Sequence, residues 1–195
     1  MQVRALALIV FTMILLGGCS KPSADQLMAT ANKNYDAAVA SADSVRLSGD
    51  VKVHFQPSID AYEKVANEYP GTPQAERALY LIATIRNNDT HEPELAVGAY
   101  RHYLAAFPVG AQAPSALFLI GFIYNNEIHN MDSAAAAYRE FLARFPQSEM
   151  ASSAQYELDH LGQPADMSFP DTSAHENASA AKKAPSRASR SGNPS

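Results

Sequence analysis

The helical pattern of this chain is clearest in residues 117–146, which read LFLIGFIYNNEIHNMDSAAAAYREFLARFP. Large apolar residues recur three and four positions apart on both sides of its polar middle, and this spacing is the period of an α-helix. Asn125-Asn126 favour a turn between the two halves. Pro146 stops the second half, because the residue before a proline is disfavoured in helical geometry. The stretch therefore predicts two helices joined by a short turn.

The chain repeats this pattern with a period of 38 residues. Equivalent positions hold Tyr62, Tyr100 and Tyr138; Val65, Tyr103 and Phe141; Tyr69-Pro70, Phe107-Pro108 and Phe145-Pro146; Ala75, Ala113 and Ala151; and Tyr80, Phe118 and Tyr156. A fixed period of 20–50 residues is typical of a helical solenoid. We expect the tyrosines at 62, 100 and 138 to be core residues that pack between the repeats.

These residues resemble the tetratricopeptide repeat. The positions that carry the resemblance in residues 117–146 are Leu117, Ile120-Gly121, Tyr124, Ala134, Tyr138 and Pro146. Residues 79–108 fit less closely, because the position equivalent to Tyr124 is not aromatic. The resemblance implies an all-α solenoid of helical hairpins over residues 24–162.

About three repeats and a capping helix fit into this region. The first hairpin is predicted at residues 24–47 and 55–70, with a long connection at 48–54. The capping helix is predicted at residues 149–161, where Gly162 acts as a C-terminal stop.

The N-terminus reads as a targeting segment. One positive charge at Arg4 precedes the apolar run 5–16, and Leu16-Gly17-Gly18-Cys19 follows. This order is typical of a secretory signal peptide, whereas the apolar run is too short for a membrane-spanning helix. The Leu-Gly-Gly-Cys motif resembles the lipobox of bacterial lipoproteins. The resemblance implies removal of residues 1–18, a covalent lipid on Cys19 and a short linker at 19–23; Ser20, rather than Asp, favours the outer membrane.

The 38-residue spacing is similar to that of the outer-membrane assembly lipoprotein BamD and of the C-terminal domain of CpoB, a periplasmic protein associated with Tol–Pal. The resemblance implies a lipid-anchored periplasmic scaffold that binds other envelope proteins, in outer-membrane protein assembly or in envelope coordination. An accessory subunit of a cell-wall enzyme is the competing class of function.

Residues 163–195 differ in composition from the repeats. They are rich in Ala, Ser and Pro, with Met167 and Phe169 as the only large apolar residues, and they end in the basic residues Lys182, Lys183, Arg187 and Arg190. Such a segment is expected to be disordered, because it cannot bury enough apolar surface to offset the entropy of ordering. It is interpreted as a solvated tail or as a weak electrostatic tether to an anionic surface.

The composition excludes several classes of function. The net charge of -5 argues against a nucleic-acid binder. A single cysteine rules out an intramolecular disulfide and any cysteine-based zinc or iron–sulfur site. No catalytic motif is present, so we expect no enzyme and no cofactor besides the lipid. His91 with Glu92 and Glu94 could ligate a metal, but acidic residues at a helix start explain them better.

The candidate binding residues come from the resemblance, since the first helix of each tetratricopeptide hairpin lines a groove. The positions carried over are Arg77, Tyr80, Thr84, Asn87 and Asn88; Ser115, Phe118, Phe122, Asn125 and Asn126; and Tyr156 and His160. Aromatic and amide side chains suit a bound protein segment. For Tyr80, Phe118 and Tyr156, packing against the neighbouring helix is an equal alternative.

Overall fold

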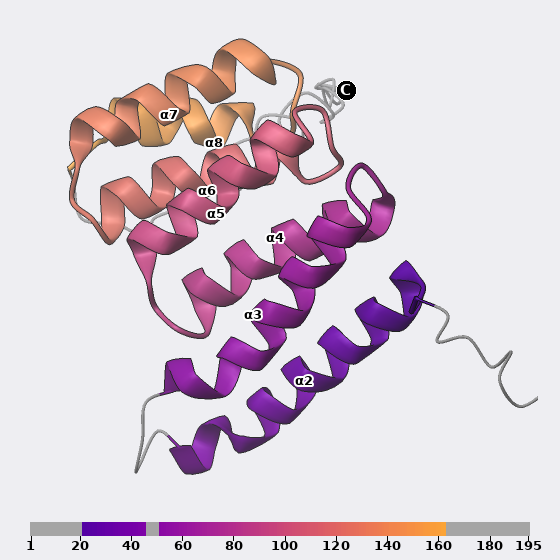
Figure 1. The fold of residues 1–195 in the computed structure, drawn as a ribbon. Helices are drawn as coiled ribbons and strands as arrows, with labels where there is room; N and C mark the ends of the chain where they lie inside the picture. The colour runs from indigo at the N-terminus through magenta and orange to yellow at the C-terminus, as the bar shows by residue number, and fades with distance from the viewer. Residues whose placement is uncertain (1–20, 46–50, 163–195) are drawn as a thin grey trace, which may run out of the picture. The chain divides into compact units, whose positions relative to one another are not determined.

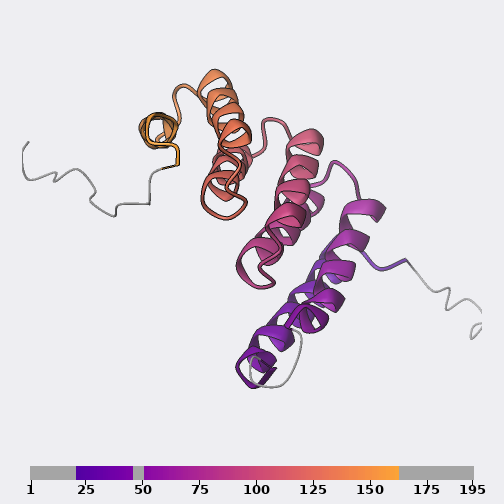
Figure 2. The same ribbon diagram turned by 90° about the vertical axis from the view of Figure 1, so that its left-hand side faces the viewer.

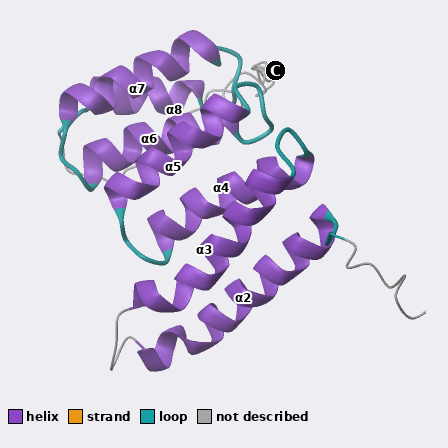
Figure 3. Cartoon of the chain, in the orientation of Figure 1, coloured by secondary structure: helices purple, strands orange, loops and turns teal. Residues whose placement is uncertain are grey.

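A computed structural model describes residues 21–45 and 51–162, which form seven α-helices and no strand (Figures 1 and 3). The all-α prediction is therefore confirmed. The helices are α2 (Ala24–Val45), α3 (Val51–Glu68), α4 (Pro73–Asn88), α5 (Pro93–Ala106), α6 (Ala113–Asn126), α7 (Met131–Arg144) and α8 (Ala151–Asp159).

Helices that are neighbours in the chain pack against each other as hairpins. The hairpins are α2 with α3, α4 with α5, and α6 with α7, and each second helix also contacts the helix that follows it. Figure 2 shows the hairpins side by side in chain order. Three hairpins followed by α8 form the tetratricopeptide-like solenoid that the 38-residue period predicts.

Each hairpin ends where an aromatic residue precedes a proline. α3 stops at Glu68, directly before Tyr69-Pro70. Phe107 and Phe145 follow α5 and α7 with φ angles of -132° and -128°, outside helical geometry. The following proline disfavours helical geometry at these residues, so the aromatic-proline pairs separate one hairpin from the next.

The turn inside the second hairpin is repeated inside the third. His91 and His129, which are 38 residues apart, both have a positive φ, 50° and 57°. In both turns the next residue's N–H donates to the carbonyl six residues earlier at 2.8 Å. The sequence period is therefore a period of backbone geometry as well.

The repeated tyrosines form the centre of each hairpin. Tyr62, Tyr100 and Tyr138 are 2%, 1% and 0% exposed, which confirms them as core residues. Burial raises the pKa of all three hydroxyls, and that of Tyr100 rises to about 12. Gly121 lets the Tyr138 ring approach α6, because a Cβ at Gly121 would lie 2.7 Å from that ring.

Glu76 fixes the connection between the second and third hairpins. Its Oε1 accepts the Tyr103 hydroxyl at 3.0 Å and the Ala111 N–H at 2.9 Å. The Tyr103 hydroxyl in turn accepts the Gln112 N–H at 3.1 Å. A Cβ at Gly110 would lie 2.4 Å from the same Glu76 oxygen, so the connection fits tightly around this carboxylate. These bonds hold the start of α6 against α4 and α5.

The first hairpin departs from the predicted boundaries. α3 begins at Val51 rather than at residue 55, so Pro57 lies inside the helix and removes one backbone hydrogen bond. Phe55 is 2% exposed, with its ring 5.8 Å from that of Tyr35 on α2. Burial of a phenylalanine side chain, at about 2 kcal/mol, offsets much of the proline's cost.

The capping helix is shorter than predicted. α8 spans Ala151–Asp159 rather than 149–161, and Gly162 has a positive φ of 75°. The predicted signal peptide, Cys19 and the tail at 163–195 lie outside the described residues. Within residues 21–45 and 51–162, no helix combines the length and the apolar character needed to cross a membrane.

Candidate functional site

The predicted groove residues on α4 and α6 include two aromatic side chains that pack inwards. The half-buried Tyr80 ring lies 5.8 Å from the Tyr100 ring and 5.6 Å from the Tyr103 ring. Phe118, one period later, lies 5.5 Å and 6.0 Å from the rings of Tyr138 and Phe141. In both hairpins this aromatic residue joins the two helices, which is the packing alternative for Tyr80 and Phe118.

Two further aromatic side chains face solvent. Phe122 on α6 is 36% exposed and Tyr156 on α8 is 44% exposed. The Tyr156 ring stacks on His160 with a centroid distance of 4.0 Å. The Ser115 hydroxyl on α6 contacts the Met150 sulfur, directly before α8, at 4.0 Å. This contact brings the starts of α6 and α8 together, and we name Phe122, Tyr156 and His160 the α6–α8 aromatic face.

Several polar groove residues form hydrogen bonds with nearby groups of the same helix. The Thr84 hydroxyl donates to the Tyr80 carbonyl at 3.0 Å, and Asn87 Nδ2 donates to Asn88 Oδ1 at 2.7 Å. Asn126 Nδ2 donates to the Phe122 carbonyl at 3.0 Å. These bonds orient the side chains but use only part of the donors and acceptors of each amide.

The remaining polar positions differ in how far they reach solvent. The Asn125 side chain is buried, at 6% exposure. Asn87 Oδ1 is buried and has no hydrogen-bond partner among the described residues. Arg77 is exposed, and its positive charge opposes the burial that raises the pKa of the Tyr62 hydroxyl. Among the predicted groove positions, the exposed side chains are Arg77, Asn88, Phe122 and Tyr156, and His160 is partly exposed.

A second surface feature is a cleft of about 330 Å³ between α3 and α5, with α4 beneath it. Leu79 and Ile82 of α4 form its apolar floor. Glu63 on α3, and Glu94 and His102 on α5, lie at its rim. The repeat pattern did not predict this cleft, although the residues that differ between the repeats carry its signal.

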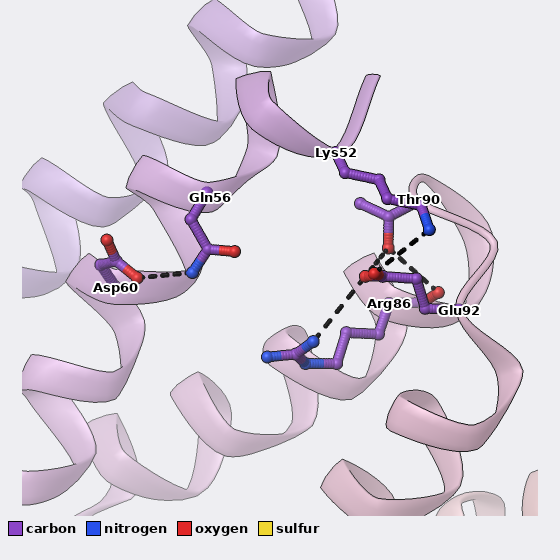
Figure 4. A network of polar contacts seen from close by, with 6 residues as sticks. All are labelled: Lys52, Gln56, Asp60, Arg86, Thr90 and Glu92. Carbon is purple, nitrogen blue, oxygen red and sulfur yellow. Dashed lines mark hydrogen bonds and ion pairs between the residues drawn. The ribbon is translucent and has the colours of Figure 1, made fainter. Parts of the chain in front are cut away.

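A polar network fixes one end of this cleft (Figure 4). The Glu92 carboxylate accepts the Thr90 hydroxyl at 2.7 Å and pairs with Lys52 at 3.4 Å and Arg86 at 3.7 Å. Lys52 comes from α3, Arg86 from α4, and Glu92 caps α5, so three helices are joined at one carboxylate.

The same network involves Glu92, which was considered as a metal ligand together with His91 and Glu94. The carboxylate of Glu92 is engaged by two cations, and the turn geometry explains the position of His91. Among residues 21–45 and 51–162 there is no group of three His, Cys, Asp or Glu side chains that could hold a metal ion.

The third hairpin is the part of the chain that matches a known protein family. Residues 115–148 match the tetratricopeptide repeat. The match covers α6 and α7, and the preceding hairpins follow the same 38-residue pattern. No curated protein matches the chain.

The tetratricopeptide match points to a class of function. Tetratricopeptide solenoids are protein-interaction scaffolds that present extended surfaces to partners, and they typically lack catalysis. The carboxylates at the cleft rim, Glu63 and Glu94, are both exposed to solvent.

Proposed function

We propose that this protein is a lipid-anchored scaffold of the bacterial envelope, which binds a segment of another envelope protein on its α6–α8 aromatic face. The observation that carries the proposal is the exposure of Phe122 and Tyr156 on neighbouring first helices. Exposed aromatic side chains supply much of the binding energy of protein interfaces, at about 2 kcal/mol or more for each buried anchor.

The role within the envelope follows from the resemblances. A lipid on Cys19 would hold the repeats at the outer membrane, facing the periplasm, as in BamD-like assembly of outer-membrane proteins. The lipid anchor favours this role. The short array of three hairpins favours a CpoB-like adaptor instead.

The test is partner capture by a double variant. Phe122→Ala with Tyr156→Ala should abolish co-purification of the partner with the lipidated protein, while the helical circular dichroism signal stays unchanged. Tyr80 is unsuitable for this purpose, because its ring supports Tyr100 and Tyr103.

The control removes exposed apolar side chains elsewhere. Val39→Ala with Val53→Ala changes residues that are 46% and 66% exposed on α2 and α3. Partner capture that survives in the aromatic variant, or that is lost in this control as well, would contradict the proposal. Removal of residues 163–195 should leave capture intact, because a tail without large apolar anchors adds little specific contact.

A further inference from the structure

The cleft between α3 and α5 exists because the first junction between hairpins differs from the second. At the first junction, Ala66 and Gly98 line the space. Their equivalents one period later are Leu104, which is buried at 5% exposure, and Ala136. The smaller side chains leave Leu79 and Ile82 slightly exposed, at 6% and 5%. At the second junction, which Leu104 fills, the equivalent Leu117 and Ile120 are 0% exposed.

The rim shows the same contrast. Glu63 and His102 stand at the positions where the second junction has Arg101 and Glu140. Arg101 Nη1 and Glu140 Oε2 are 2.6 Å apart, so an ion pair bridges α5 and α7. Since Glu63 and His102 do not form such a pair, the first junction stays open.

The open rim carries negative charge. Neither Glu63 nor Glu94 takes part in an ion pair among the described residues, whereas Arg86 beside them is paired with Glu92. Leu95, 51% exposed, extends the apolar floor to the edge of the cleft. The surface therefore combines an apolar hollow with two free carboxylates.

We propose that this cleft docks a segment of another protein in which a large apolar side chain is flanked by lysine or arginine. The apolar side chain would lie on Leu79 and Ile82, and the cations would meet Glu63 and Glu94. A volume of about 330 Å³ is at the lower limit of ligand pockets, which suits one or two anchoring side chains. The proposal goes beyond the function above, because the cleft and the α6–α8 aromatic face share no residue.

The chain's own basic tail fits this chemistry less well. Its cations, from Lys182 to Arg190, have no large apolar residue among them. Met167 and Phe169 stand beside Asp166 and Asp171 instead. We therefore assign the cleft to a separate protein and make the tail an outcome of the test.

The probe is a short synthetic peptide with leucines flanked by lysines, labelled for fluorescence anisotropy and titrated with the full chain. Two matched peptides carry glutamate in place of lysine, or serine in place of leucine. The expected result is binding of the first peptide alone, weakened by high salt because ion pairs at an exposed rim are screened.

The decisive variant is Gly98→Leu. A Cβ at Gly98 meets nothing within 4 Å, so leucine there obstructs the cleft without a clash in the fold. Ala136→Leu makes the same change at the equivalent exposed position of α7. Gly98→Leu should weaken peptide binding about tenfold or more, as loss of an anchoring pocket does, while Ala136→Leu leaves it unchanged and circular dichroism shows both variants folded.

The charge variant is Glu63→Gln with Glu94→Gln, which should weaken binding about fivefold and remove most of the salt dependence. The proposal is overturned if the lysine peptide does not bind, if Gly98→Leu binds as well as the unaltered chain, or if the glutamate or serine peptide binds equally well. It is also overturned if removal of residues 163–195 raises the affinity, because the tail would then occupy the cleft.

Discussion

Tyr62, Tyr100 and Tyr138 occupy one position of the repeat, but their hydroxyls meet different surroundings. The Tyr62 hydroxyl donates to Asn32 Oδ1 at 2.8 Å. The Tyr138 hydroxyl is buried without a hydrogen-bond partner among the described residues. The aromatic ring is what the repeat requires, while the hydrogen bond is local to each hairpin.

This difference predicts opposite effects of removing the hydroxyl. Tyr62→Phe should lower the free energy of unfolding by about 1 kcal/mol, the usual loss for one hydrogen bond. Tyr138→Phe should leave it unchanged or raise it by about 1 kcal/mol, because it removes an unpaired buried group. Urea denaturation followed by circular dichroism measures both, and equal destabilisation by the two variants would contradict the assignment.

Two glutamates should make opposite contributions to stability as the pH changes. Partial burial raises the pKa of Glu140, but hydrogen bonds from Arg101 and Arg144 outweigh it and hold the pKa below its ordinary value. This stabilisation is present above the unfolded pKa, about 4.3, and is lost as the pH falls through the folded value. Burial raises the pKa of Glu157, an effect that His160 opposes, so its ionised form destabilises the fold as the pH rises.

Glutamine at each position should therefore give opposite results. Glu140→Gln should lower the free energy of unfolding at neutral pH by about 1 kcal/mol, for two partly exposed ion pairs. Glu157→Gln should raise it by about 0.5 kcal/mol. Both differences should shrink at pH values below the folded pKa of each group. Thermal unfolding across this pH range is the measurement, and pH-independent differences would contradict it.

At the scale of the element, α6 approaches α7 only because position 121 lacks a side chain. Gly121→Ala would place a Cβ 2.7 to 2.9 Å from the Tyr138 ring, so we expect a loss of about 1–3 kcal/mol from overpacking. Gly98→Ala is the control, because alanine favours a helix over glycine by about 1 kcal/mol and nothing obstructs it there. Equal gains in thermal stability from both variants would show that the helices do not pack as described.

The helices themselves were largely predictable, because their periodicity, their terminal prolines and the repeat agree. The start of α3 was not: the helix was predicted from residue 55, whereas it begins at Val51 and buries Phe55 against Tyr35 of α2. That burial depends on a tertiary contact between residues 20 positions apart, and no local pattern reveals it.

The candidate site was only partly predictable for a related reason. Tyr80, Phe118 and Phe122 all fall on first helices. Tyr80 and Phe118 pack against the tyrosines opposite, Tyr100 and Tyr138, whereas Phe122 is 36% exposed. The cleft follows from the small side-chain volume at Ala66 and Gly98. The repeat pattern is recognised by its large apolar residues, so small residues at these two positions do not stand out.

At the scale of the whole molecule, the proposed anchor and the repeats have separate functions. Replacing Cys19 by Ala should abolish lipidation and release the protein from the membrane fraction, because the lipid would supply most of the membrane affinity. The free energy of unfolding of the helices should not change, since none of their described contacts involves Cys19. Membrane-bound protein with an uncleaved leader would contradict the anchor.

The central claim is that the α6–α8 aromatic face binds a partner protein, and photo-crosslinking in cells tests it most directly. A benzophenone amino acid replaces Phe122 in one variant, Tyr156 in a second, and Val109, 90% exposed in the α5–α6 connection, in a third. The account predicts that positions 122 and 156 crosslink to the same protein and that position 109 does not. Crosslinks from position 109 alone, or none from positions 122 and 156, would contradict it.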